Sequence, residues 1–405
     1  MLSSPSFGRT QNGTAYITGA FPHYCNPIVS EPTVLVFAHC NGFCKEVWLP
    51  VIEDLSRLMQ ETFSQKVPVE KQIAPKAAPM IRYVALDFLG HGQSAPLVMD
   101  EHLPTWRESL VPSLREVLQE KVYLTENERS NSDLKRPWNA IGVGHSLGGT
   151  GLLMHELKYP GIFQHLVLFE PVVIPPPRRK VFTEKKANSD LKKDSTVENL
   201  IAKGKTMTDK FNIFLFLKSF PHPLVHRTLQ RRTSWKDEKE ALIYFKKRFP
   251  NFDSRSLSAY VQGGMYYSSS NIGDERNVSS LDESYPLLSH HDENKSSNQN
   301  ESLLYALRCN PVTEAAYYAS VGDSIVPMLK QIKCPIILIA GPESDHFNGP
   351  WGDTVSHFRN ISKLMGGECS LSLVKDGSHF CTMEHPRKCA ALIFTVLARS
   401  RKCLL

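Results

Sequence analysis

The sequence predicts an α/β protein with a mainly parallel β-sheet flanked by helices and interrupted by a basic helical insertion. Short apolar, β-rich runs alternate with helical patterns through the first half of the 405-residue chain, and the alternation returns near the C-terminus. A proline-marked basic stretch separates the two parts at 175–330. The length allows one domain or two, and this pattern favours a single core, 1–174 and 331–405, split by an insertion.

Each strand of the predicted sheet corresponds to one apolar run. The first four are TVLVFAH (33–39), IRYVALDF (81–88), WNAIGVGHS (138–146) and QHLVLFEP (164–171). Apolar residues at helical spacing from Val47 to Leu58 predict an amphipathic helix between the first two, and so a β-α-β unit. Two further strands are expected within CPIILIAGPESDHF (334–347) and CSLSLVKDGSHF (369–380), followed by a helix at about 385–398.

The insertion begins at PPPRRK (175–180), where three prolines disfavour both helix and strand. From Pro175 to Pro250 there are 19 Lys and Arg against 8 Asp and Glu, a local balance of +11 in a chain of net charge +6. Helices are expected at 196–220, 236–248 and 301–311. The polar tract 268–299 is expected to be a mobile loop, and its His-His-Asp-Glu cluster at 290–293 is not expected to bind a metal.

Composition excludes several classes of protein. Hydrophobic residues make up 41% and charged residues 22%, as in ordinary globular proteins. No apolar run approaches the roughly 18 residues that a membrane helix needs, and no secretory signal is recognisable, so an intracellular location is expected. Nine cysteines without a C-x-x-C pair predict reduced thiols and no structural metal.

The strongest motif is Gly144-His145-Ser146-Leu147-Gly148, a G-x-S-x-G between an apolar strand and a helix. A nucleophilic serine there must occupy a sharp turn with small neighbours, which glycine provides. The N-terminus of the following helix would favour negative charge beside the serine. The pattern therefore predicts that Ser146 is a nucleophile.

Three further segments appear with this motif in a characteristic order: AHCNGF (38–43), LDFLGHGQS (86–94) and DGSHF (376–380). Together, over roughly 31–174 and 331–400, they resemble the α/β-hydrolase superfamily. The resemblance implies the α/β-hydrolase fold with a helical lid inserted after strand six, and an oxyanion hole made by the backbone N–H groups of Leu147 and Asn41. Cys40 stands where the superfamily usually has a second glycine, which would narrow that hole.

The resemblance also implies that His379 is the general base, because the superfamily places its histidine after the last strand. His39, His91, His145 and His385 are the competing histidines. Two carboxylates fit the position of the acid: Glu170, 24 residues after Ser146 at the end of a buried strand, and Asp345 in a polar loop. An unpaired carboxylate is costly at the buried position, so Glu170 is favoured over Asp345. The segment LVLFEPVVIPP around it is similar to fungal peroxisomal lipases and acyl-coenzyme A hydrolases of secondary metabolism.

These residues predict a serine hydrolase that cleaves an acyl ester or thioester, as a lipase, esterase or acyl-coenzyme A hydrolase does, through an acyl-enzyme and without cofactor or metal. The expected partner is a small acyl substrate. The basic lid is a candidate for contact with coenzyme A phosphates or a membrane surface, whereas nucleic-acid binding has no support. The alternative is a non-catalytic protein that binds a small molecule on the same fold. The expected location is cytoplasmic or peroxisomal, although Cys403-Leu404-Leu405 matches a peroxisomal address incompletely. The sequence does not indicate an oligomeric state.

Overall fold

The computed structural model describes residues 4–22, 29, 31–63, 81–99, 103–122, 139–174, 210–269, 303–320, 324–348 and 351–402. Eight strands form one sheet in the order β1-β2-β4-β3-β5-β6-β10-β11. The six parallel strands are β3 (Thr33–Ala38), β4 (Ile81–Leu86), β5 (Asn139–His145), β6 (Phe163–Phe169), β10 (Ile336–Ala340) and β11 (Cys369–Leu373). All six were predicted from the apolar runs, and the α/β-hydrolase architecture is confirmed.

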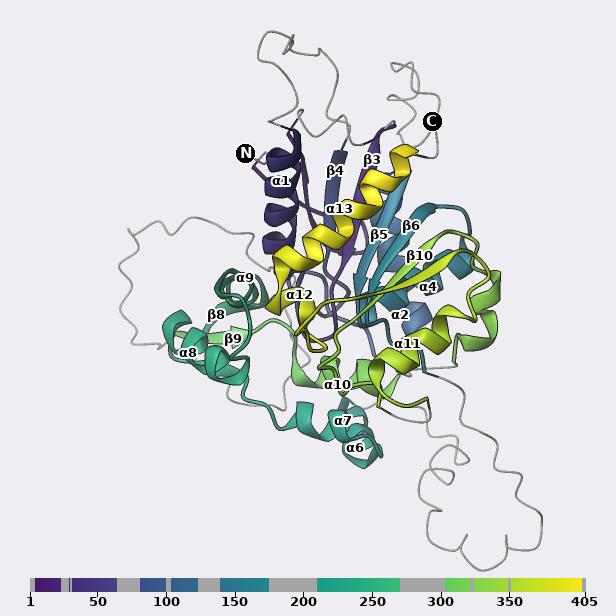
Figure 1. Cartoon of the computed structure of the whole chain (residues 1–405). Helices are drawn as coiled ribbons and strands as arrows, with labels where there is room; N and C mark the ends of the chain where they lie inside the picture. Colours follow the sequence, from purple (N-terminus) through teal and green to yellow (C-terminus); the bar gives the residue numbers. More distant parts are fainter. Residues whose placement is uncertain are drawn as a thin grey trace, which may run out of the picture.

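Helices cover both faces of the sheet (Figure 1). On one face lie α1 (Leu49–Phe63), which follows the short helix η2 (Lys45–Trp48), and α13 (Pro386–Lys402), which follows α12 (Cys381–Glu384). On the other face lie α2 (Trp106–Lys121), α4 (Leu147–Lys158) and α11 (Thr354–Ser362). In β3, Leu35 and Phe37 pack into the first core while Val34 and Val36 pack into the second. A strand buried on both faces explains why its sequence is a continuous apolar run.

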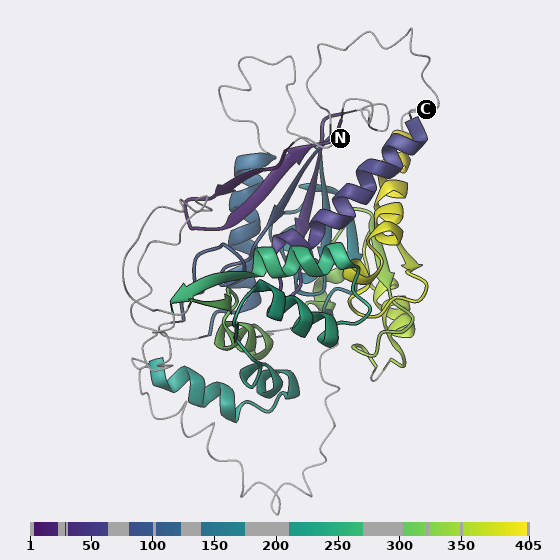
Figure 2. The same ribbon diagram turned by 90° about the vertical axis from the view of Figure 1, so that its left-hand side faces the viewer.

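Between β6 and β10 the chain leaves the sheet and forms a separate group of elements. These are α6 (Lys210–Ser219), α7 (Pro223–Leu229), β7 (Ser234–Trp235), α8 (Glu238–Arg248), α9 (Ser254–Gly264), β8 (Met265–Ser269), β9 (Leu303–Leu307), α10 (Pro311–Ala319) and η4 (Val326–Gln331). Figures 1 and 2 place most of this group at the end of the sheet opposite the two chain termini. Ser146 follows β5 at the same end, and Leu224 of α7 and Tyr318, in α10, line the cavity beside it.

The structure corrects part of the predicted insertion. The segment 301–311, expected to be helical, contains β9, which pairs with β7 and β8 in a small antiparallel sheet. Tyr305 of β9 is buried and contacts the ring of Tyr267 across the ladder, and this cross-strand packing outweighs the helical spacing of the leucines. The helix predicted at 236–248 is confirmed by α8.

Some features were not predicted, and some predictions fall outside the described residues. The antiparallel strands β1 (Ser6–Arg9) and β2 (Ala15–Ala20) and the helix α2 were not predicted from the sequence. Residues 175–209, the predicted loop beyond Ser269, and the terminal residues 403–405 lie outside the described part of the chain. Within that part, no helix is both long enough and apolar enough to span a membrane.

Candidate active site

Ser146 occupies the sharp turn that the motif predicted. Its backbone has φ 51° and ψ −116°, a strained conformation between the end of β5 and the start of α4. A Cβ on Gly144 would lie 2.6 Å from Gly149 Cα, and one on Gly148 would lie 2.2 Å from the carbonyl oxygen of Ala38. Both flanking positions therefore require glycine, because any larger residue would force the turn open.

The structure brings Ser146, His379 and Glu170 into one line of hydrogen bonds. Nε2 of His379 lies 3.1 Å from Ser146 Oγ, and its Nδ1 lies 2.7 Å from Glu170 Oε2. His379 comes from the turn between β11 and α12, and Glu170 directly follows β6, so three separate segments converge here. The carboxylate accepts a hydrogen bond from the Nδ1–H group. The lone pair on Nε2 is then free to take the serine proton.

The carboxylate of Glu170 is held by the loop that follows β10. Its Oε1 accepts a hydrogen bond from the Gly341 N–H at 2.8 Å, and its Oε2 accepts one from Ser344 Oγ at 2.7 Å. Glu170 itself has φ 44°, so two of the three non-glycine residues with positive φ in the described chain belong to this arrangement. The Asp345 side chain is 90% exposed and bonds neither Ser146 nor His379. The geometry thus places Glu170, the favoured acid, beside the histidine.

Burial shifts both titrating partners away from their charged forms. Desolvation raises the pKa of Glu170 to about 7, although the hydrogen bonds from Gly341 and Ser344 act in the opposite direction. Desolvation also lowers the pKa of His379 well below its usual range. Because the two groups are in direct contact, a proton taken up near neutral pH belongs to the pair as a unit.

The backbone N–H groups of Asn41 and Leu147 are the predicted donors of an oxyanion hole. Asn41 and Leu147 both line the cavity that opens on Ser146. In the described part of the chain, neither N–H donates to a protein acceptor. Cys40 lines the same cavity and so occupies space that a glycine would leave open.

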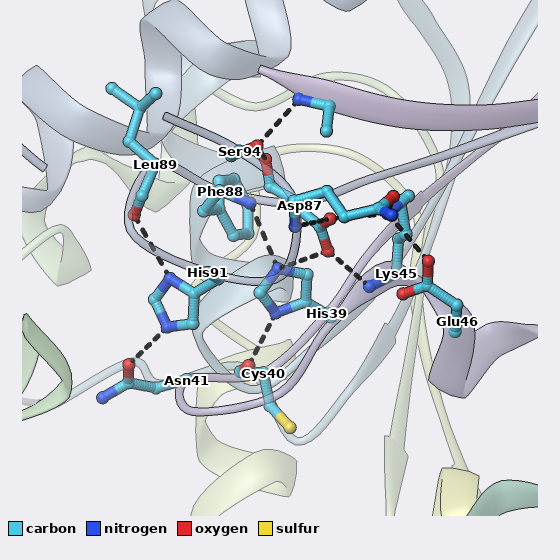
Figure 3. Close-up of polar contacts among 12 residues, drawn as sticks. His39, Cys40, Asn41, Lys45, Glu46, Asp87, Phe88, Leu89, His91 and Ser94 are labelled. Atoms are coloured by element: carbon cyan, nitrogen blue, oxygen red, sulfur yellow. Dashed lines mark hydrogen bonds and ion pairs between the residues drawn. The ribbon is translucent and has the colours of Figure 1, made fainter. Parts of the chain in front are cut away.

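Two buried histidines hold the loop that carries Asn41 (Figure 3). His39 lies 2.7 Å from the carbonyl oxygen of Cys40 through Nδ1 and accepts the Phe88 N–H at Nε2, so it is a neutral ring with its proton on Nδ1. Nε2 of His91 lies 3.0 Å from Asn41 Oδ1. Burial lowers the pKa of both rings, which keeps these supports uncharged.

The insertion also contacts this loop. Asn41 Nδ2 donates to the backbone oxygen of Glu314 in α10 at 3.1 Å, and Tyr317 Oη of the same helix donates to the Leu89 carbonyl at 3.1 Å. Trp106 of α2 in turn donates its indole N–H to the Tyr317 carbonyl at 2.7 Å. The helix α10 is therefore fixed to the core beside the candidate oxyanion hole.

A buried ion pair anchors the far end of the loop that carries Asn41 (Figure 3). Lys45 Nζ lies 2.7 Å from Asp87 Oδ2, 2.8 Å from Glu46 Oε1 and 2.9 Å from Gln93 Oε1, and the side chains of Lys45 and Asp87 are fully buried. The Lys45 N–H also donates to Asp87 Oδ1 at 2.7 Å. Burial alone would lower the pKa of Lys45, but Asp87 and Glu46 raise it above its ordinary value. The aspartate of the LDFLGHGQS segment is thus the buried partner of Lys45, which gives that segment a structural role.

We expect Lys45→Met to lower the free energy of unfolding by about 3–5 kcal/mol, because it leaves the Asp87 carboxylate buried without its cation. Chemical denaturation of the purified variant measures this loss. The matched control is Lys45→Met combined with Asp87→Asn, which removes both charges and should recover part of the loss. Equal destabilisation in the single and double variants would contradict the account of this pair.

The cavity beside Ser146 has a volume of about 290 Å³. Its lining is mainly apolar and aromatic and comes from the core and the insertion: Cys40, Asn41, Trp106, Ser146, Leu147, Val172, Ile174, His222, Leu224, Tyr318, His346, Phe347, Asn348, His357, His379 and Phe380. None of these described lining residues is a lysine or arginine. In the described chain, no group of three or more His, Cys, Asp or Glu is arranged to hold a metal ion.

Sequence reasoning missed the contribution of the loop after β10. Gly341 and Ser344 hold the acid, and His346 stacks on His379. The segment GPESDHF contains these residues, but only its Asp345 was predicted as a candidate for the site.

The competing histidines have other partners. His145 Nε2 lies 2.8 Å from the His379 carbonyl oxygen, and His385 Nε2 lies 2.9 Å from the Asp376 carbonyl oxygen. His39 and His91 hold the loop that carries Asn41, as described above. None of these four histidines bonds the serine hydroxyl, whereas His379 does.

Comparison with known proteins gives one family and many similar folds. Residues 35–392 match a family described as the alpha/beta hydrolase family. Among curated proteins, none matches the chain in sequence. A peroxisomal alpha-beta-hydrolase of Saccharomyces cerevisiae is 17% identical with a TM-score of 0.55, over 99% of this chain and 89% of its own. A thioesterase domain from the curacin biosynthetic pathway is 15% identical with a TM-score of 0.57, over 98% of this chain and 99% of its own. An esterase of Mycobacterium tuberculosis is 15% identical with a TM-score of 0.52, over 98% of this chain and 92% of its own. At these identities the structural similarity shows the fold alone.

Proposed function

The chain belongs to the alpha/beta hydrolase family, and from that membership we propose that it is a serine hydrolase acting on an acyl ester or thioester. Ser146 is the nucleophile, His379 the general base and Glu170 the acid that orients it. The observation that carries the proposal is the continuous hydrogen-bonded line from Ser146 Oγ through His379 to Glu170, at the edge of a largely apolar cavity.

In the proposed mechanism, Ser146 Oγ attacks the acyl carbon while His379 Nε2 takes its proton. Glu170 stabilises the imidazolium that forms, and the N–H groups of Leu147 and Asn41 hold the oxyanion of the tetrahedral intermediate. His379 returns the proton to the leaving group, leaving an acyl group on Ser146. Water activated by the same histidine then attacks this acyl-enzyme and releases the acid.

The cavity favours an uncharged acyl group of modest size. Its volume of about 290 Å³ is near the lower end of the roughly 300–1,000 Å³ typical of small-molecule sites. Trp106, Leu147, Val172, Phe347 and Phe380 supply apolar surface. Without a lining lysine or arginine, the phosphates of a coenzyme A thioester would lie outside it, where the basic insertion is the candidate to meet them. A simple ester is therefore the first substrate class to test.

The proposal is tested by offering the purified protein esters of p-nitrophenol with acyl chains of increasing length and the matching acyl-coenzyme A thioesters. We expect kcat/KM to be highest for short or medium apolar acyl esters and to fall for long chains. No turnover of any ester or thioester, by a protein with a normal folded signal in circular dichroism, would argue against the proposed activity.

We expect kcat/KM to fall as the pH decreases through about 7, approaching a loss of about tenfold per pH unit below it. A proton added to the pair as pH falls resides on Glu170 or on His379. A protonated Glu170 would donate to Nδ1 of His379, so that the ring proton moves to Nε2 and the lone pair facing Ser146 is lost. Initial rates across a pH series from about 5 to 9 check this, and a profile that stays flat down to about pH 5 would contradict it.

A further inference from the structure

His346 lies directly over the candidate base. Its imidazole ring is parallel to that of His379 within 10°, with the ring centroids 3.9 Å apart. The His346 side chain is 37% exposed, whereas that of His379 is 7% exposed, so His346 is the ring of the pair nearer to solvent. No step of the proposed mechanism uses this ring.

The stacked ring belongs to the same loop that holds the acid. Gly341 and Ser344, a few residues earlier in this loop, donate to Glu170, so one segment restrains both partners of Ser146. The rings of His145 and Phe380 approach His379 at 5.1 Å and 5.3 Å, tilted by 47° and 71°. Only His346 presents a parallel face. A ring stacked in this way restricts rotation of the His379 side chain out of the plane that joins the serine to the acid.

We propose that His346 is a positioning residue whose ring stacks on His379 and holds it in line between Ser146 and Glu170. This inference rests on the proposed function and deepens it. A stacked aromatic pair is worth a factor of up to about ten in an equilibrium or rate constant.

The charged and titratable groups that face the two rings are Asp345, whose Oδ1 lies 3.6 Å from His346 Nδ1, together with Glu170 and His145. His346 lowers the pKa of His379 in addition to the larger effect of burial, whereas Asp345 raises it. Replacing His346 by an uncharged ring should therefore raise the pKa of His379.

The kinetic test compares His346→Phe, which keeps a flat neutral ring, with His346→Leu, which keeps apolar bulk without a face. We expect His346→Leu to lower kcat about tenfold with little change in KM, and His346→Phe to stay within about threefold of the wild type. Equal kcat in the two variants would overturn the inference.

A second readout does not require turnover. The imidazole signals of the labelled protein are followed by NMR through a pH titration, with the His379 signal assigned by its loss in His379→Gln. We expect His346→Phe to raise the pKa of His379 relative to the wild type, and an unchanged value would overturn the inference. If the pKa rises but no ester is turned over, the proposed function fails while the stacking inference stands.

Discussion

Replacement of Ser146 by alanine is expected to lower kcat by roughly 10⁵–10⁶-fold, because it removes the only group in the line of hydrogen bonds that can attack the acyl carbon. KM should change little, because the cavity walls remain in place. Steady-state kinetics on the best ester of the acyl series measures the loss. A residual rate above that in water would come from the N–H groups of Leu147 and Asn41 and from substrate binding.

The matched control for this variant is Ser362→Ala. The Ser362 hydroxyl donates only to the Arg359 carbonyl of its own helix at 2.9 Å, away from the cavity. It should leave kcat and KM unchanged. Turnover that survives in Ser146→Ala at more than about one part in a hundred would show that another group attacks the substrate.

The second large effect distinguishes the two carboxylates. Glu170→Gln is expected to lower kcat about 10⁴-fold, whereas Asp345→Asn should stay within about threefold of the wild type. A glutamine amide has one oxygen and one NH₂ group. If its oxygen accepts from Gly341, its NH₂ group faces Nδ1 of His379 and moves the ring proton to Nε2, where it blocks the base.

Measuring kcat for the two variants side by side also provides the control, since each removes one negative charge from the same end of the sheet. A collapse of kcat in Asp345→Asn with little change in Glu170→Gln would reverse the assignment of the acid. Circular dichroism of Glu170→Gln should match that of the wild type, because the two side chains have nearly the same shape.

Much of the fold could be predicted from the sequence because the sheet is buried on both faces. Strands covered by helices read as continuous apolar runs, and all six parallel strands were identified in this way. The antiparallel strands β1 and β2 were missed because neither is a continuous buried apolar run. The edge strand β1 is largely exposed, and the second half of β2 is only partly buried. The segment that forms β9 was predicted to be a helix. Its apolar residues fit both the helical and the strand period, and its pairing with β8 is a tertiary contact.

The candidate site shows the same division between local and tertiary information. Ser146 was predictable from its glycines, whose role is local, and the order of motifs led to His379 and Glu170. The positive φ of Glu170, 44°, and the stacking of His346 on His379 were not predictable. Both depend on segments far apart in sequence that meet only in the fold. The partner of Asp87 was likewise not predictable, because nothing near Lys45 in the sequence marks it as buried. The roles of the insertion as a lid and of the basic stretch in binding, and the cytoplasmic or peroxisomal location, stay predictions.

The central claim, an activated serine at position 146, is tested most directly by labelling with a fluorophosphonate probe, which reacts with serines activated by a neighbouring base. We expect one covalent adduct on the wild-type chain, mapped by mass spectrometry to the peptide that contains Ser146, and no adduct on Ser146→Ala. An unlabelled wild type, or equal labelling of both proteins, would contradict the account and favour a protein that binds a small molecule on this fold without turning it over.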